Sequence, residues 1–302
     1  MYVVTGDPLD LLCKSVHLAL ESAGYEACLV ANPMLPPFRF VWRLDTLSSV
    51  SRLILEDETV LSDSQISAVL VRRACSLSEG TGDPDDLAYI QEEADAAFLA
   101  WLWSLDCVVV NRYPPGVWYR QDQPLLLWRH LLERCGLRAL DSIISNASVD
   151  LACGRTDLGA QVTYVPLTRE GGEFLNLGDC SENEPVLGNR VPAHFMQPGT
   201  DQERLCVIGS RVVWDGRPYA NRYAIESALA CFCELAGLTF LEVVLKRVQD
   251  ETRVAAVNPH PRLEDFTSAA QSEIVVALVS LLTGSQLPNF REAACAGNEE
   301  PL

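Results

Sequence analysis

The stretch from Leu238 to His260 constrains the fold of this chain more than any other part of the sequence. Phe240–Val244 alternates and then becomes continuously apolar, and Val254–Val257 is a second apolar run, so both are predicted to be strands. The polar residues Gln249–Glu251 between them predict a turn, and Asn258-Pro259 predicts the end of the second strand. The stretch therefore predicts a β-hairpin near the C-terminal end of the chain.

Length and net charge limit what kind of protein this chain can be. Its 302 residues are enough for two or three subdomains around a substantial core. A formal net charge of −18 argues against nucleic-acid phosphate as a partner, and a basic peptide or basic protein surface fits better. The sequence has no apolar run of about 18 residues, so we expect no membrane span.

The cysteines and the N-terminus indicate a cytoplasmic protein. Eleven cysteines are scattered at irregular spacing, and an odd count in a chain of this size is a poor disulfide framework. Met1–Gly6 has no basic segment and begins like a strand, so we expect no secretory signal. Reduced thiols in a reducing, cytoplasmic compartment are the expectation.

The N-terminal part alternates strands and helices. Tyr2–Thr5 and Glu26–Ala31 are typical of short strands, and apolar residues between them recur at helical spacing. Asp7-Pro8 predicts the helix start, with Asp7 as N-cap and the proline in the first turn. Together these form a βαβ unit, without the Gly-x-Gly-x-x-Gly of a dinucleotide site. Ile66–Val71 is predicted to be a buried strand.

Further elements are predicted from alternation, helical spacing and Gly or Pro punctuation. In chain order they are a hairpin over Phe38–Leu44 and Ser51–Glu56, a long helix capped by Asp83-Pro84, a strand over Asp106–Val110, a helix over Leu125–Cys135, an extended segment over Ala139–Ile144, a hairpin over Val162–Leu167 and Glu173–Leu177, strands over His194–Gln197 and Arg204–Gly209, and helices over Arg222–Ala236 and Ser272–Leu282.

The order of these motifs resembles that of a known family. Val69-Leu70-Val71-Arg72-Arg73 is followed by an acidic-capped helix, then Val-Val-Asn-x-x-Pro, a helix, Gly-Leu, and an extended segment ending in Ser-Asn. This order is similar to the amino-terminal half of the RimK-like branch of the ATP-grasp ligases, and closest to the ligases that cross-link ribosomal peptides, the graspetide (microviridin-type) macrocyclases. The hairpin ending in Val-Asn-Pro resembles the last metal-binding hairpin of the same family.

The resemblance implies an α/β fold of the ATP-grasp kind. It predicts an N-terminal Rossmann-like domain over residues 1–120, a shortened lid subdomain over residues 121–192, and a C-terminal α+β domain over residues 193–302. It also implies a reaction in which a carboxylate and ATP form an acyl phosphate that an amine or hydroxyl then displaces. Lid lysines and a pair of Mg²⁺ ions offset the charge repulsion in that reaction.

The phosphate-binding lysines of the family are missing at the matching positions. The lysine of the first lid strand is Val165 here, and the earlier lysine falls near Gln123. The whole chain has only two lysines, Lys14 and Lys246, and neither lies on a predicted lid strand. Arg169, in a glycine-rich turn, is a candidate substitute on a nucleotide, and an exposed turn residue is the other interpretation.

Three further arginines are candidates for binding an anionic group. Arg204 stands where the resemblance places an arginine facing phosphate or the substrate carboxylate, which makes it the catalytic candidate. Arg72 and Arg73 end a predicted strand before a βα loop, a position that suits an anion. The other interpretation is a surface or ion-pair residue for Arg204, and surface charge for Arg72 and Arg73.

The metal ligands of the family are also substituted. The resemblance places acidic ligands at Val244 and Ala256 and leaves Asn258 as the one matching ligand. Glu242 shares a strand face with Val244, but lies about 7 Å away along the strand. A Mg–oxygen bond of about 2 Å does not bridge that distance. Asn258 and Glu242 are nevertheless the candidate metal ligands.

Three functions remain open at this stage. The first is a degenerate ATP-grasp protein without ligase turnover and without a cofactor, which binds a peptide or a protein partner such as an active ATP-grasp ligase, in a homo- or hetero-oligomer. The second is an active carboxylate–amine ligase that uses ATP and Mg²⁺ at an atypical site. The third is an acidic structural partner of a basic protein.

Overall fold

The computed structural model describes residues 1–46, 49–72, 83–112, 125–145, 158, 162–164, 175–177, 193–217 and 219–284. The helices are α1 (Leu11–Ser22), α2 (Pro84–Ser104), α3 (Leu125–Arg134), α5 (Arg222–Ala236) and α6 (Ser268–Thr283). The strands are β1 (Tyr2–Thr5), β2 (Ala27–Val30), β3 (Arg39–Leu44), β4 (Ser49–Ile54), β5 (Val60–Ser62), β6 (Ala68–Val71), β7 (Val108–Val110), β8 (Ser142–Ser145), β9 (Val162–Tyr164), β10 (Leu175–Leu177), β11 (Ala193–Met196), β12 (Thr200–Ile208), β13 (Arg211–Trp214), β14 (Phe240–Val248) and β15 (Glu251–Asn258).

A parallel four-stranded sheet organises the N-terminal part. Its strand order is β2-β1-β6-β7, and every residue of β6 is buried, as expected of a strand covered on both faces. Val4 and Leu70 pack with α1 and α6 on one face. Val3 and Val69 pack with α2 on the other. The predicted βαβ opening is therefore confirmed.

The first helix begins three residues later than predicted. Asp10, not Asp7, is the N-cap, and its carboxylate accepts the N–H of Leu12 at 2.7 Å. Asp7 instead accepts the N–H of Leu9 at 2.7 Å in the preceding turn. The Asp10 carboxylate also accepts a hydrogen bond from Arg72, which is 62 residues away in the sequence, so local sequence patterns do not reveal this contact.

A small antiparallel sheet, β3-β4-β5, lies beside α2. Its inner face contributes Leu53 and Leu61 to the core around Phe98 and Trp101. The Trp101 indole N–H donates to the Ser51 hydroxyl at 2.8 Å, so the sheet is held to α2 by a polar contact as well as by packing.

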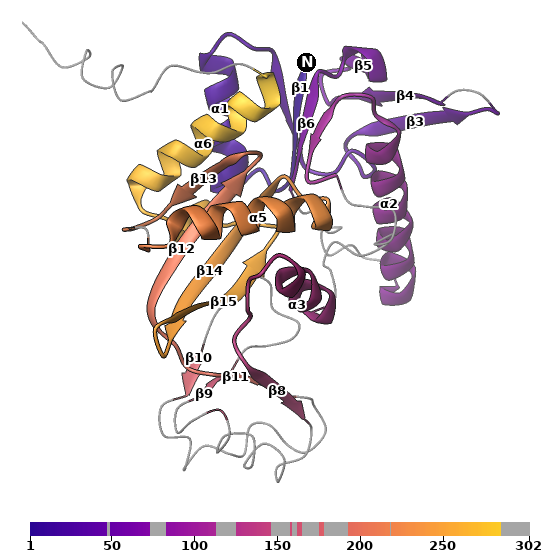
Figure 1. Cartoon of the computed structure of the whole chain (residues 1–302). Helices are drawn as coiled ribbons and strands as arrows, with labels where there is room; N and C mark the ends of the chain where they lie inside the picture. The colour runs from indigo at the N-terminus through magenta and orange to yellow at the C-terminus, as the bar shows by residue number, and fades with distance from the viewer. Residues whose placement is uncertain are drawn as a thin grey trace, which may run out of the picture.

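The C-terminal part is built on an antiparallel sheet in the order β13-β12-β14-β15. Helix α5 packs on one face, where Leu229 and Phe232 meet Leu241 and Val243. Helix α6 covers part of the other face and also packs against α1, so one apolar core joins the N-terminal and C-terminal sheets. Figure 1 shows α1 and α6 side by side at the top of the molecule.

The C-terminal hairpin that the sequence predicts is β14–β15, and both strands extend further than expected. The turn has two residues, Gln249 and Asp250, with φ of 49° and 67°, the positive values of a type I′ hairpin turn. Glu251, predicted to lie in the turn, pairs with Val248 in the sheet. Ala255 is an extra residue, since the register shifts between the Val244–Ala256 and Leu245–Val254 pairs.

A third antiparallel sheet, β10-β9-β11-β8, lies at the far end from the parallel sheet (Figure 1). It includes the hairpin predicted over residues 162–177, of which β9 and β10 are described. Within the described residues, no helix is both long and apolar enough to cross a membrane.

Candidate functional site

The candidate site lies on β14 and β15, where four positions of the predicted metal site form two cross-strand pairs. Val244 lies opposite Ala256, and Glu242 lies opposite Asn258. The Asn258 amide donates to the Glu242 carboxylate at 3.1 Å. The pair in which the resemblance places two acidic ligands is therefore apolar, and the adjacent pair on the same face carries one carboxylate and one amide.

Arg204 approaches the Glu242 carboxylate from the neighbouring strand β12. Its Nε lies 3.3 Å from Glu242, its Nη1 lies 3.3 Å from the Asp265 carboxylate, and Nη1 also donates to the Asp265 carbonyl at 3.1 Å. The guanidinium stacks over the Phe266 ring with 5.5 Å to the centroid. Arg204, the predicted catalytic residue, is thus held in an ion-pair network within the protein.

The protonation of Glu242 depends on this network. Its side chain is only 6% exposed, and burial raises the pKa of the carboxyl above its usual value. The Arg204 guanidinium and the Asn258 amide oppose that rise. Glu242 is therefore a buried carboxyl whose charged form depends on Arg204.

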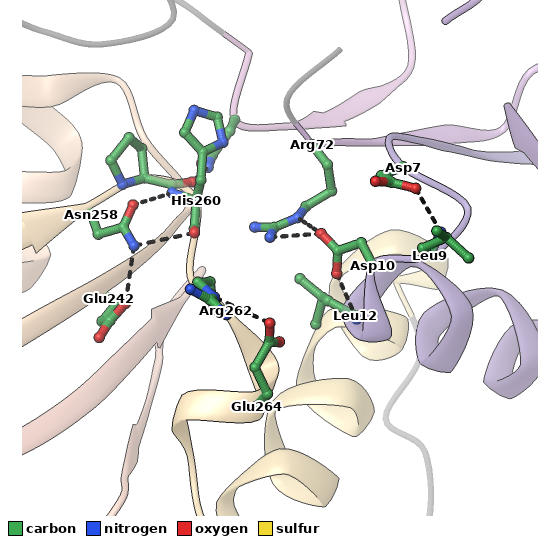
Figure 2. Close-up of polar contacts among 12 residues, drawn as sticks. Asp7, Leu9, Asp10, Leu12, Arg72, Glu242, Asn258, His260, Arg262 and Glu264 are labelled. Atoms are coloured by element: carbon green, nitrogen blue, oxygen red, sulfur yellow. Dashed lines mark hydrogen bonds and ion pairs between the residues drawn. The ribbon is translucent and has the colours of Figure 1, made fainter. Parts of the chain in front are cut away.

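Asn258 also organises the chain that follows β15. Its Nδ2 donates to the His260 carbonyl at 3.1 Å, and its Oδ1 accepts the His260 N–H at 2.9 Å. Figure 2 shows these bonds together with the bond to Glu242. Both ends of the Asn258 amide are thus engaged by protein groups.

Arg72 lies at the end of β6, facing the chain around His260 (Figure 2). Its Nε and Nη2 donate to the Asp10 carboxylate at 3.0 and 2.9 Å, and its side chain is only 7% exposed. Its Nη1 is buried without a hydrogen-bond partner in the described part of the chain. The guanidinium predicted to receive an anion is thus largely neutralised by an internal carboxylate.

Asn111, which the sequence offers only as part of Val-Val-Asn-x-x-Pro, ties the N-terminal sheet to the candidate site. Its Oδ1 accepts the N–H groups of Thr239 and Phe240 at 3.2 and 2.9 Å. Its Nδ2 donates to the carbonyls of Phe240 and Pro259 at 2.6 and 2.9 Å. One buried amide thus holds the start of β14 and the end of β15.

Lys246 is a further site residue that was not predicted. It is buried on β14, two positions after Val244, so alternation places both side chains on the same face. Burial lowers the pKa of Lys246. The same spacing argument that placed Glu242 beside Val244 would have found Lys246.

Several predicted residues lie outside the described residues. They are Arg73, Arg169, Val165 and Gln123. Of the remaining candidates, the structure brings Arg204, Glu242 and Asn258 together, and it engages Arg72 with Asp10.

The residues at this site do not fit the Mg²⁺ ions that the resemblance implies. Mg²⁺ needs oxygen ligands at about 2.0–2.1 Å, usually carboxylates. The Val244–Ala256 pair offers none, and the adjacent carboxylate is occupied by Arg204 and Asn258. No cluster of three or more His, Cys, Asp or Glu side chains suited to a metal occurs in the described segments.

Family models and curated sequences give no match to this chain, whereas comparison with solved structures does. The macrocyclase MdnC from Microcystis aeruginosa MRC, solved bound with precursor peptide MdnA, is 17% identical. It superposes with a TM-score of 0.72 over 94% of this chain and 99% of that one. The Chryseobacterium gregarium RiPP-associated ATP-grasp ligase, solved with ADP and a leader and core peptide, is 15% identical, with a TM-score of 0.71 over 95% and 97%.

A RimK domain ATP-grasp protein from Sphaerobacter thermophilus DSM 20745 is also similar. It is 18% identical, with a TM-score of 0.54 over 93% of this chain and 98% of that one. At these identities the likeness establishes the fold, and the coverage shows that it extends over nearly the whole chain. This chain has the α/β ATP-grasp fold, in the arrangement of the RimK-like and peptide-modifying ligases.

Proposed function

We propose that this chain is an ATP-grasp-fold protein that has lost ligase turnover and binds a peptide or a protein partner in a biosynthetic pathway. The loss concerns the part of the fold that holds nucleotide and metal. The peptide part of the proposal rests on the solved neighbours, two of which were determined with bound precursor or leader peptides.

One observation carries the loss of turnover, namely the pairing of Val244 with Ala256 across β14 and β15. Two aliphatic side chains stand where the resemblance places a pair of acidic metal ligands. Glu242 does not replace them, because Arg204 and Asn258 engage its carboxylate. Freeing Glu242 for a cation would leave the mostly buried Arg204 with fewer partners, which costs free energy.

Calorimetric titration of the protein with ATP and Mg²⁺ tests this proposal. We expect no saturable heat up to millimolar nucleotide, because no described residue offers a carboxylate cage at the Val244–Ala256 pair. A dissociation constant in the micromolar range would refute the loss of nucleotide binding. Adding Mg²⁺ without nucleotide serves as the control for nonspecific cation binding to an acidic chain.

One observation favours a second candidate, an active carboxylate–amine ligase with an atypical site. Arg204, Glu242 and Asn258 converge on one another although 54 residues separate the first from the last. In this candidate Arg169 contributes to phosphate binding. A nucleotide-dependent rise in melting temperature that disappears in Glu242→Ala, but persists in the control Glu226→Ala, would support it.

The third candidate, an acidic structural partner of a basic protein, rests on the net charge of −18. It predicts co-purification with a basic protein and separation at high salt. Seven cysteines in the described segments are free thiols, which suits the reducing, cytoplasmic compartment that we propose for all three candidates.

A further inference from the structure

The outer face of the β3–β4–β5 sheet carries an ordered mixture of arginines and aliphatic residues. Its inner face is buried against α2, so the outer face is the exposed one. Each cross-strand pair of β3 and β4 on this face joins one arginine to one aliphatic side chain. The pairs are Arg39–Ile54, Val41–Arg52 and Arg43–Val50.

Three arginines lie near one another on this face, and one of them has an ion-pair partner. Arg52 lies diagonally between Arg39 and Arg43, at the spacing of about 7–8 Å typical of such neighbours. Arg39 forms an ion pair with Glu58 at the β4–β5 turn. The described residues show no ion pair to Arg43 or Arg52 (residues 47 and 48 are not described). A local positive face therefore stands on a chain whose net charge is −18.

The same sheet has an edge at β3. In the described part of the chain β3 pairs only with β4, so its other side is an edge strand. The β3–β4 hairpin extends away from the rest of the molecule (Figure 1). Val41 and Val50 on its outer face are 57% and 49% exposed. An edge strand with arginines resists pairing with other apolar strands, yet accepts a strand of complementary charge.

We propose that the β3 edge binds an extended, acidic peptide segment as an additional strand. Carboxylates of that segment pair with Arg39 and Arg43, and an aliphatic side chain lies against Val41. This inference deepens the proposed function, because it names a surface and a chemistry for the polypeptide partner. It rests on the proposed partner binding and does not depend on the proposed loss of ATP-dependent ligase turnover.

The aliphatic residues on this face favour an acidic peptide over other binding partners. Nucleic acid would engage the arginines, but its phosphates gain nothing from Val41 or Val50, and the net charge of −18 repels it. A second copy of the chain could pair β3 with β3, but would place Arg39 and Arg43 beside the same residues of the partner copy. A carboxylate-bearing strand satisfies the backbone edge, the guanidinium groups and the aliphatic positions together.

The test is fluorescence anisotropy with the full chain and a labelled peptide that contains Glu-Thr-Val-Thr-Glu. This sequence places Glu, Val and Glu on one face and reads the same in both strand directions. The variant Arg43→Glu/Arg52→Glu should weaken binding about tenfold or more, because residue 43 would then repel the peptide carboxylate and residue 52, diagonal to it on the same face, would add to that repulsion. The control variant Arg138→Glu/Arg211→Glu changes the net charge equally on exposed sites elsewhere and should leave affinity unchanged.

Two further probes test the strand geometry and the aliphatic contact. Of two peptides N-methylated on alternate residues, only the one methylated on the N–H groups that face β3 should lose binding. The variant Val41→Thr/Val50→Thr keeps side-chain shape and β propensity and should weaken binding severalfold. A peptide with Lys in place of Glu should not bind.

The proposal is overturned if the Glu peptide does not bind at millimolar concentration. It is equally overturned if Arg43→Glu/Arg52→Glu binds the peptide as tightly as the control variant Arg138→Glu/Arg211→Glu. It is also overturned if both methylated peptides still bind, if oligothymidylate binds more tightly than the peptide, or if Arg43→Glu/Arg52→Glu abolishes dimers that the wild-type protein forms. Calorimetry with ATP and Mg²⁺ decides the loss of turnover separately. A tight nucleotide complex would remove that proposal and leave this one standing, whereas charge-independent peptide binding would do the reverse.

Discussion

Replacing Asn111 with Ala tests whether one amide joins the N-terminal sheet to the β14–β15 hairpin. The Asn111 side chain is fully buried and makes four hydrogen bonds, two accepted from the N–H groups of Thr239 and Phe240 and two donated to the carbonyls of Phe240 and Pro259. At roughly 1 kcal/mol net for each lost bond, their removal costs about 4 kcal/mol. The Asn111 φ of 59° adds about 1 kcal/mol for alanine in the left-handed region.

The expected destabilisation of about 5 kcal/mol corresponds to a fall in melting temperature of about 10 °C, at roughly 2 °C per kcal/mol for a large domain. Thermal unfolding followed by circular dichroism measures it. Asn111→Gly loses the bonds without the φ strain, so it should melt about 2 °C higher than Asn111→Ala. Asn221→Ala removes an amide that makes no capping bond and should have little effect. A change of less than about 1 kcal/mol in Asn111→Ala would show that other contacts hold the two sheets together.

Three other predictions concern charge and thiols. Arg204→Met removes the cation that opposes the raised pKa of Glu242, so the folded state holds that proton more tightly. Stability should then fall more steeply than in wild type as pH rises above the usual carboxyl pKa in thermal melts, and adding Glu242→Gln should abolish the difference. Burial lowers the pKa of His194 to about 4, so the unfolded state binds more protons between about pH 4 and 6.5. Stability should therefore rise with pH across that range, and melts of His194→Gln should show a flatter rise. The Sγ atoms of Cys135 and Cys231 lie 3.2 Å apart, so oxidised glutathione should form a disulfide between them, seen as a mass loss of about 2 Da that is absent in Cys231→Ser.

Local signals in the sequence predicted those elements whose causes are local. Asp83 caps α2 and accepts the N–H of Asp85 at 2.9 Å, as Asp83-Pro84 indicated. Gly237 ends α5 with a φ of 69°, so the helix runs over Arg222–Ala236 as predicted. Helix caps of this kind depend on the identity of a few neighbouring residues, which is why the local sequence located them.

Long-range partners decided the features that the sequence did not reveal. Asp7-Pro8 is a plausible cap by its composition, but Asp10 both caps α1 and binds Arg72, and that ion pair belongs to the parallel sheet. The strand β5 was missed because Val60–Ser62 is too short for alternation to be visible. Arg72 looked like an anion site because its acidic partner is distant in sequence.

The candidate site shows the same division between local and distant causes. Alignment of motifs placed Val244 and Ala256 at the positions of acidic ligands, and the observed register sets these two residues opposite one another. Because Ala255 is an extra residue, simple counting from the turn would have paired Val244 with Ala255. The motif ending in Asn258 therefore located the pair more accurately than hairpin geometry alone.

The order of side chains along β14 explains why Glu242 does not replace the acidic metal ligand that is missing at Val244. Glu242, Val244 and Lys246 share one face of the strand, so a buried carboxyl, an aliphatic group and a buried amine follow one another at about 7 Å intervals. Arg204 balances the carboxylate, and Lys246 adds positive charge on the far side of Val244. A divalent cation at Val244 would therefore approach the Arg204 and Lys246 side chains, while the carboxylates of Glu242 and Asp265 already pair with Arg204. Such a charge distribution disfavours Mg²⁺ even where backbone geometry is retained, which supports the proposed loss of ligase turnover.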